Sequence, residues 1–516
     1  MTPPDWNLAD RTLAYQKLED HQRKVGDIDH ACAILDWDQA VIMPAKAGAS
    51  RADALSTLRG LRHQLATAPE LESLLGEAQV EAGKGLLDDW QRANLNELSQ
   101  QYRRALCVPR DLVEASSRAE AHSEQAWRAL RAKNDWASFL PYLQEVVSLK
   151  RQTAQALADA LHTTPYDALV DGFEAGITQE QIDGLFNDLR GFLPQFLQAC
   201  LSKQAKDKVV ELHGPFPIAL QKQLGERLMA AIGFDFTIGR LDVSHHPFCG
   251  GLPRDVRVTT RYKEGDFTSS LMGVLHETGH AKYEQGLPDR WLGQPVGAAR
   301  GMATHESQSL FTEMLIARSP AFLKFAAPLI AQTFSDEAAS QAEGFSAHNL
   351  YTLGTRVRPG FIRVDADEVT YPSHIILRYE IERDLIAGKL QVAEIPDAWG
   401  ALLQELLGLS VAGNYRDGCM QDVHWPAGLF GYFPLYTLGA LIAAQLQHAL
   451  ARELPDLNRQ IASGHFKEID DWLRAKIWSQ GSLLPSHELL MRATGEPLST
   501  RDFKAHLQAR YLDDRE

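Results

Sequence analysis

The chain has 516 residues, of which 45% are hydrophobic and 23% are charged, a composition typical of a soluble globular protein with room for a sizeable core. Its formal net charge of −15 argues against nucleic acid or an anionic membrane as a partner, because both are bound through concentrated lysine and arginine. The five scattered cysteines include no C-x-x-C pair, which argues against a disulfide framework or a thiolate metal site and favours a reducing compartment.

The N-terminal part of the sequence is typical of helices. From Leu8 to about Ala205, apolar residues recur three and four positions apart between short turns, and strand-like alternation never lasts beyond a few residues. We therefore predict that residues 1–205 are helical. The first six residues lack the basic region and apolar core of a secretory signal, so we expect a cytoplasmic protein.

The sequence after Phe216 is more varied. Residues 217–234 predict one more helix, and residues 239–248 are rich in turn formers. Residues 255–262 alternate with period two and carry β-branched side chains, which makes them the best strand candidate in the chain. A strand at this place could pair with an extended peptide through backbone hydrogen bonds.

Helical patterns fill the rest of the chain. They cover residues 306–318, 321–333, 336–354, 371–387, 396–409 and 436–452, and a terminal set between 456 and 511. The uncharged stretch 425–447 has prolines and glycines in its first half, so we predict a buried loop followed by a core helix, not a membrane span. With no repeat or linker, residues 1–516 are predicted to form one domain of the mainly α class.

The run His276-Glu277-Thr278-Gly279-His280 is an H-E-x-x-H pattern on a segment that reads as a helix. Two histidines four positions apart lie on one helical face, so both imidazoles can bind one cation, and Glu277 can reach a water on that cation. This is the arrangement of a zinc hydrolase. After the motif, residues 286–288 predict the end of the helix, because glycine tolerates a left-handed cap and proline cannot continue a helix.

A catalytic zinc needs three protein ligands and an open position for water, so one ligand remains to be found. Zinc hydrolases with a glutamate as third ligand take it from a later helix, and Glu306 begins such a helix here. Glu306 is our candidate, although a glutamate in a first helical turn also complements the helix dipole. His305 is the competing ligand, and Glu313 is a weaker one.

Six motifs follow one another from residue 246 onward. They are His246-Pro247-Phe248, residues 255–259, residues 276–286, His305-Glu306-Ser307, residues 362–367, and residues 418–425 with 430–434. In type and order they resemble the carboxypeptidase Taq family of zinc-dependent metallocarboxypeptidases. The resemblance implies a mainly α-helical, elongated homodimer with a deep groove, a divalent metal on His276, His280 and Glu306, and Glu277 as the catalytic carboxylate. We expect residues 1–205 to wall the groove, residues 206–516 to carry the metal, and a small sheet to lie beside the H-E-x-x-H helix.

A carboxypeptidase must recognise a free terminal carboxylate, and arginine suits that planar anion best. Arg363 is the first candidate, because the resemblance places its motif at the groove, and Arg257 is the second. Arg363 could instead form a structural ion pair with Asp365 or Asp367. The first motif adds His246 as a substrate-binding candidate.

The tetrahedral intermediate of peptide hydrolysis carries an oxyanion, which needs a hydrogen-bond donor beyond the metal. His424 and Tyr432 are the candidates, although each could be a satisfied polar group of the core.

The predicted function is removal of the C-terminal residue from peptides by a chain that binds one divalent metal, with Zn²⁺ as the expected ion and Co²⁺ or Mn²⁺ as substitutes. A zinc endopeptidase or dipeptidyl carboxypeptidase would differ only in where the groove ends. From another class, a helical peptide-binding protein with a vestigial H-E-x-x-H is the remaining alternative.

Overall fold

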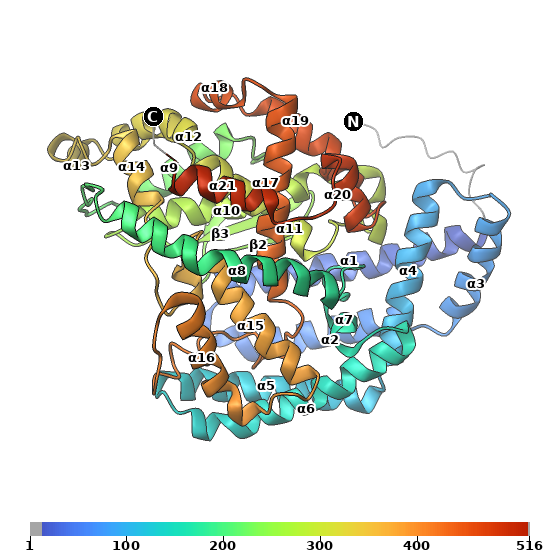
Figure 1. The fold of residues 1–516 in the computed structure, drawn as a ribbon. Coiled ribbons are helices and arrows are strands. Elements are labelled where there is room, and N and C mark those ends of the chain that lie inside the picture. Colours follow the sequence, from blue (N-terminus) through green and yellow to red (C-terminus); the bar gives the residue numbers. More distant parts are fainter. Residues whose placement is uncertain (1–12, 514–516) are drawn as a thin grey trace. The chain divides into compact units, whose positions relative to one another are not determined.

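The computed structural model describes residues 13–513, and these form 21 α-helices and one three-stranded β-sheet (Figure 1). The predicted mainly α fold with one small sheet is confirmed. The expected start of the helical pattern, Leu8, is among residues 1–12, which lie outside the described residues.

The chain forms two compact units, and each is built from three separate segments. Unit 1 comprises Met1–Leu106, Pro217–Arg300 and Phe466–Leu489, and unit 2 comprises Cys107–Phe216, Gly301–His465 and Leu490–Glu516. The expectation of one catalytic domain over residues 1–516, with parts 1–205 and 206–516, stays a prediction.

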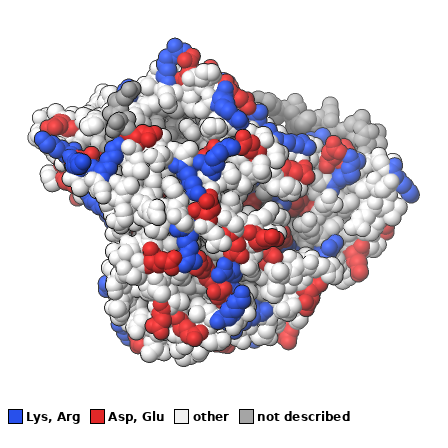
Figure 2. Space-filling view, viewed as in Figure 1, with Lys and Arg blue, Asp and Glu red and all other residues white. Residues whose placement is uncertain are grey.

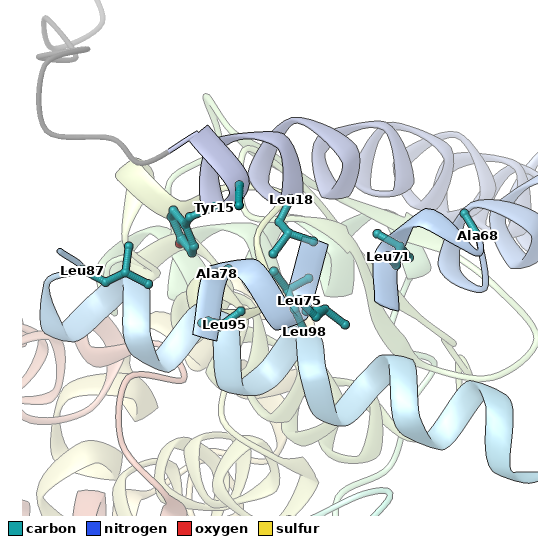
Figure 3. Close-up of a cluster of buried hydrophobic side chains, with 10 residues drawn as sticks. Tyr15, Leu18, Ala68, Leu71, Leu75, Ala78, Leu87, Leu95 and Leu98 are labelled. Atoms are coloured by element: carbon teal, nitrogen blue, oxygen red, sulfur yellow. The ribbon is translucent and has the colours of Figure 1, made fainter. Parts of the chain in front are cut away.

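Unit 1 begins with four helices that confirm the predicted helical N-terminal part. They are α1 (Leu13–Val41), α2 (Gly48–Ala66), α3 (Glu70–Gly83) and α4 (Asp89–Cys107). Apolar residues spaced three or four apart on α1, α3 and α4 pack into one buried cluster, whose labelled members include Tyr15, Leu18, Leu71, Leu75, Leu95 and Leu98 (Figure 3). Beside this cluster the buried amide of Asn94 donates to Tyr15 Oη and to Gln294 Oε1, both at 3.0 Å, which ties α4 to the second segment of the unit.

The sheet of unit 1 follows α9 (Ile218–Ala231). Its strands are β1 (Gly239–Val243), β2 (Phe248–Leu252) and β3 (Asp255–Thr260), in the order β1-β3-β2, with β1 parallel and β2 antiparallel to β3. Val256 and Val258 of β3 pack on Val274 and Ala281 of α10 (Phe267–Gly286), the H-E-x-x-H helix. The small sheet beside that helix is therefore confirmed.

The structure adds to one expectation for this region and overturns another. Residues 239–248 are rich in turn formers and include the connection 244–247, but most of them pair with β3 as β1 and the start of β2. These strands are too short, and one of them too rich in glycine, to show a clear period of two. Furthermore, β3 is the central strand, so its hydrogen-bonding edges are both occupied and it cannot take up a peptide as an additional strand.

Helix α10 ends at Gly286 as predicted, but this glycine has a different role from the predicted one. The residue that follows, Leu287, is extended with φ −64° and ψ 156°, so there is no left-handed cap. A Cβ on Gly286 would lie 2.7 Å from Cβ of Trp478, in the 3₁₀ turn Trp478–Gln480 after α19 (Lys467–Lys476). Glycine is required here for the close approach of a buried tryptophan.

Gly286→Ala should lower the free energy of unfolding by about 1–3 kcal/mol, the usual cost of inserting a methyl group into a packed core. The matched control is Gly273→Ala on the same helix, where the new Cβ meets only Thr260 Oγ1, at 4.0 Å, and alanine should be neutral or stabilising. Urea unfolding of the three proteins measures the difference. Equal midpoints for the two variants would contradict the packing argument.

Unit 2 is built of α-helices, shorter helical turns and loops, and its described residues include no β-strand. Its helices are α5 (Arg110–Ala132), α6 (Trp136–Leu161), α7 (Pro165–Val170), α8 (Gln179–Gln204), α11 (Met302–Leu310), α12 (Pro320–Thr333), α13 (Ser335–Ser340), α14 (Ala347–Gly354), α15 (Tyr371–Ile386), α16 (Ile395–Leu407), α17 (Pro434–Glu453), α18 (Leu457–Ala462) and α21 (Arg501–Tyr511), while α20 (Ser486–Thr494) begins in unit 1. Figure 1 shows α5 and α6 side by side. Helix α11 continues as a π-helical turn, Phe311–Ala317, and the helix predicted over 336–354 is broken in two.

The uncharged stretch 425–447 forms a loop followed by α17, most of whose residues are buried, as predicted. Among residues 13–513, no single helix has the length and apolar composition needed to cross a membrane, and one bent pair, Pro295–Ala317 with Pro320–Thr333, passes on those two criteria alone. Acidic and basic side chains are interspersed on the face drawn in Figure 2.

Candidate active site

The two histidines of the H-E-x-x-H motif lie on one face of α10. Their ring centroids are 5.1 Å apart, and the ring planes are nearly perpendicular, at 82°. The start of the helix is fixed by Asp266, whose carboxylate accepts from the backbone N–H groups of Thr268 at 2.9 Å and Ser269 at 3.2 Å. Between the histidines, Glu277 is only 8% exposed.

Glu306 lies on α11, and the start of this helix is satisfied by a distant part of unit 2. The carbonyl of Phe173 accepts from Met302 N at 2.9 Å, and the Glu174 carboxylate accepts from Ala303 N at 2.7 Å and Thr304 N at 3.4 Å. Glu174 is 2% exposed, and its negative charge complements the positive end of the helix dipole.

The packing of α11 on α17 also depends on the absence of a side chain. A Cβ on Gly439 of α17 would lie 2.8 Å from both Cβ and Cγ of Glu306. Glycine at this position therefore gives the Glu306 side chain the room that it occupies.

One group of three potential metal ligands exists among the described residues. His276, His280 and Glu306 each offer one ligand atom, and these atoms all lie within 4.8 Å of one another. Two imidazole nitrogens and one carboxylate oxygen are the donor set of many catalytic zinc sites, so these residues fit a divalent metal. The competing ligand His305 is outside the group, and Glu313 forms an ion pair with Arg318 at 2.6 Å.

Arg363 is buried, with 6% of its surface exposed. It forms an ion pair with a residue that is distant in the sequence. Its Nε and Nη2 donate to Asp422 Oδ1 at 3.1 and 2.9 Å, and its Nη1 donates to Tyr371 Oη at 2.8 Å. The expected alternative of an ion pair was thus right in kind, but the partner is Asp422, because Asp367 accepts backbone N–H groups of Val369 and Thr370 at the start of α15.

Asp422 has a second cationic partner. Arg378 of α15 is completely buried, and its Nε donates to Asp422 Oδ2 at 2.7 Å. Burial alone would raise the pKa of Asp422, but the guanidinium groups of Arg378 and Arg363 hold it well below the usual range. Two guanidinium groups therefore face one carboxylate, which leaves the cluster with one excess positive charge.

His424 and Tyr432 lie together in a group of aromatic rings. Their ring centroids are 5.7 Å apart, and both rings contact Tyr436, whose Oη is 3.2 Å from His424 Nε2. Burial lowers the pKa of His424 to about 4 and raises the pKa of Tyr432 to about 12. Near pH 7 the imidazole is therefore neutral and the phenol keeps its proton, so each can donate a hydrogen bond. His424 Nδ1 is buried and finds no hydrogen-bond partner within residues 13–513.

Comparison with known proteins identifies the family of the chain. The family model described as carboxypeptidase Taq (M32) metallopeptidase matches residues 17–511. This chain belongs to the carboxypeptidase Taq (M32) family. It is 38% identical to thermostable carboxypeptidase 1 of Thermus thermophilus, over 96% of this chain and 98% of that protein.

Solved structures of M32 proteins share the fold. Trypanosoma cruzi metallocarboxypeptidase 1 has 42% sequence identity and a TM-score of 0.94, with 97% of this chain and 99% of that chain covered. The M32 carboxypeptidase of Deinococcus radiodurans has 34% identity and a TM-score of 0.92, over 97% and 99% of the two chains. The chain is thus a metal-dependent peptidase of the M32 family, as its motifs imply.

The two remaining candidates for substrate binding in this M32 chain lie in unit 1. Arg257 donates from Nε and Nη2 to Asp255 at 2.6 and 2.8 Å, and its guanidinium lies 4.4 Å from the ring centre of Trp37. His246 is exposed in the loop between β1 and β2, and its carbonyl accepts from Ser244 Oγ. Arg257 is therefore already held in place, whereas the ring of His246 is accessible.

The sequence analysis missed several buried charged residues that hold the M32 site. Arg378 and Glu382 lie four positions apart on α15 and are completely buried, and Glu174 caps α11. No clear signal marks the first two, because α15 also carries the charged residues Glu380, Arg383 and Asp384, and the sequence does not show which of the five are buried. No sequence signal marks Glu174, since its partners lie about 130 positions away.

Glu174→Gln should raise the dissociation constant for Zn²⁺ by roughly 10-fold or more, because a group that orients a ligand affects metal affinity by about 10–100-fold. The loss of the charged cap lets α11 and Glu306 shift. A chelator-competition titration with Zn²⁺ measures the constant. The control is Asp135→Asn, which weakens the cap of α6 at Ser138 N and should leave the metal affinity unchanged. A constant that is unchanged in Glu174→Gln would contradict the positioning role.

Proposed function

We propose that this M32 protein removes single residues from the C-terminus of peptides, using one divalent metal held by His276, His280 and Glu306. The observation that carries this proposal is the grouping of these three ligand atoms within 4.8 Å, with the buried carboxylate of Glu277 in the same motif. The ion is proposed to be Zn²⁺, with Co²⁺ or Mn²⁺ as functional substitutes, because the same donors accept all three. When bound, the metal would supply a Lewis acid for the scissile carbonyl and lower the pKa of a water ligand.

Glu277 is the proposed general base. Its carboxylate takes a proton from the attacking water and then delivers it to the nitrogen of the leaving amine. The 8% exposure of Glu277 favours this role, because a site with little bulk water keeps the proton available for the leaving group.

His424 and Tyr432 are the proposed donors to the oxyanion of the tetrahedral intermediate. Both carry a proton without a charge at neutral pH, since the pKa of His424 is about 4 and the pKa of Tyr432 is about 12. Donors that are already oriented stabilise the charge as it develops.

Arg363 is the proposed anchor for the terminal carboxylate of the substrate. Three of its five N–H groups are used by Asp422 and Tyr371 among the described residues, which leaves one on each terminal nitrogen. The excess positive charge of the Arg363, Arg378 and Asp422 cluster favours an anion as its further partner. Arg257 is the second candidate.

Glu277→Gln should abolish turnover, because glutamine cannot accept the proton of the attacking water. Zn²⁺ should stay bound, because residue 277 is not one of the metal ligands. His276→Ala should lose metal and activity together, since the two remaining ligands cannot hold a catalytic zinc. Metal content by elemental analysis, measured beside the rate of amino-acid release, separates the two effects. Turnover in metal-free His276→Ala would contradict the assignment and favour a different catalytic centre.

Arg363→Lys should lower kcat/KM for peptides with a free C-terminus by roughly 10–100-fold, because a charge-assisted hydrogen bond contributes about 1.5–3 kcal/mol. Arg257→Lys is the matched variant and should have a smaller effect. Mass spectrometry of the products from free-acid and C-terminally amidated peptides gives both rate and cleavage site. Undiminished release of a single residue from the amidated peptide would instead favour an endopeptidase, and release of dipeptides would favour a dipeptidyl carboxypeptidase.

The proposed partners are peptides with free C-termini and, as the family resemblance implies, a second copy of the chain in a homodimer. We infer a cytoplasmic enzyme that binds neither nucleic acid nor membranes, supported by the net charge of −15 and by five scattered cysteines without a C-x-x-C pair. A peptide-binding protein without activity is the alternative, and it predicts that peptides bind without being shortened.

A further inference from the structure

Glu382 is a completely buried carboxylate on α15 that the proposed mechanism does not use. It accepts three hydrogen bonds. Its Oε1 accepts from Tyr166 Oη of α7 at 2.5 Å and from the backbone N–H of Gly431 at 3.2 Å, and its Oε2 accepts from Trp425 Nε1 at 3.1 Å. Two of the three donors thus belong to the loop before α17, where they stand at the two ends of the segment 425–431.

Two of these donors are neighbours in the sequence of the proposed oxyanion donors. Trp425 directly follows His424, and Gly431 directly precedes Tyr432, so a single carboxylate fixes the residue next to each proposed oxyanion donor. The backbone at Gly431 has φ +85°, and a Cβ there would lie 2.9 Å from Val170 N. The end of the loop near Tyr432 therefore has little freedom to move.

Helix α15 also holds the chain on the other side of His424. Arg378, one helical turn before Glu382, donates to Asp422, which is two residues before His424. Adjacent turns of one rigid, buried helix thus carry a cation for Asp422 and an anion for the donors of Trp425 and Gly431. The loop is attached to α15 before and after the imidazole.

We propose that Glu382 is a positioning residue, which holds His424 and Tyr432 in place through Trp425 and Gly431. This inference rests on the proposed function, because it is there that His424 and Tyr432 act as oxyanion donors. Glu382 itself does not touch the substrate in this proposal.

The ionised carboxylate suits this role because it has only acceptors, and all three neighbours are donors. Glutamine has the same shape but replaces one oxygen with an N–H₂ group. That group would face either the indole N–H of Trp425 or the Tyr166 hydroxyl and Gly431 N–H. One end of the loop would then lose its acceptor and meet a second donor instead.

Protonation of Glu382 should disturb the same contacts. Burial raises the pKa of Glu382 to about 7, although the bonds from Tyr166, Trp425 and Gly431 lower it. Of the titratable groups around it, Tyr166 has a pKa well above 10 and stays neutral, Arg378 is paired with Asp422, and His424 is neutral above about pH 4. As the pH falls through about 7, Glu382 gains a proton and the loop loses a full acceptor.

The test compares Glu382→Gln with Tyr166→Phe in the full-length, Zn²⁺-loaded protein. Both variants alter a hydrogen bond of Glu382, but only the first affects the loop. We expect Glu382→Gln to lower kcat by roughly 10–100-fold, the usual effect of small displacements of catalytic groups, with KM and the Zn²⁺ dissociation constant unchanged. Tyr166→Phe should keep the wild-type kcat. A wild-type kcat in folded Glu382→Gln, or an equal loss in Tyr166→Phe, would overturn the proposal.

A second measurement does not depend on activity. In protein labelled with 5-fluorotryptophan, the ¹⁹F resonance of residue 425 is assigned by its absence from Trp425→Phe. It should shift with a midpoint near pH 7, where Glu382, with its pKa of about 7, gains a proton. In Glu382→Gln the shift should disappear. A resonance that is independent of pH in the wild-type protein would overturn the proposal.

The outcome for the proposed function stays distinguishable. If the wild-type protein releases no C-terminal residue, the proposed function fails, while the ¹⁹F titration still decides whether Glu382 controls the loop. If Glu382→Gln does not fold, the kcat values of Trp425→Phe and Tyr166→Phe are compared instead. A loss of kcat in the first alone supports the proposal, and an equal loss in both overturns it.

Discussion

A buried carboxylate must be surrounded by hydrogen-bond donors, and contacts of this kind connect distant segments of unit 2. Glu174, Asp422 and Glu382 are all ionisable groups with little or no access to water, and each is met by several N–H or O–H groups from distant parts of the chain. Removing the partners of such a charge costs about 3–5 kcal/mol, so these contacts allow few alternative arrangements. Glu306, Arg363, His424 and Tyr432 are attached directly to the segments that these carboxylates hold.

One short segment, residues 166–174, supports two parts of the site at once. Tyr166 donates to Glu382, and the backbone of Leu169 and Val170 packs against Gly431. A few residues later the Phe173 ring lies edge-on to Tyr432, with centroids 5.1 Å apart, and Glu174 caps the helix of Glu306. The metal ligand and the oxyanion donor therefore depend on a common scaffold.

The sequence predicts the structure correctly where the pattern that determines it lies within one short segment. The spacing of His276 and His280 predicts their shared helical face, apolar periodicity predicts the main helices, and alternation predicts the strand at residues 255–260. Prediction from the sequence failed where contacts between distant parts of the chain determine the structure. The strands at 239–243 and 248–252 exist because β3 lies beside them, Gly286 is required by Trp478, and the partner of Arg363 is Asp422 and not a neighbour in the sequence. The supports of Glu306 and His424 come from side chains that no local pattern connects.

The central claim is that one metal, on His276, His280 and Glu306, makes this chain a carboxypeptidase. The most direct test is a titration of the metal-depleted protein with Zn²⁺, in which the release of a free terminal amino acid from a peptide is followed at each addition. The account predicts no release without metal and a linear rise that ends at one equivalent per chain. Full activity before metal is added, or a rise that ends at a different stoichiometry, would contradict it.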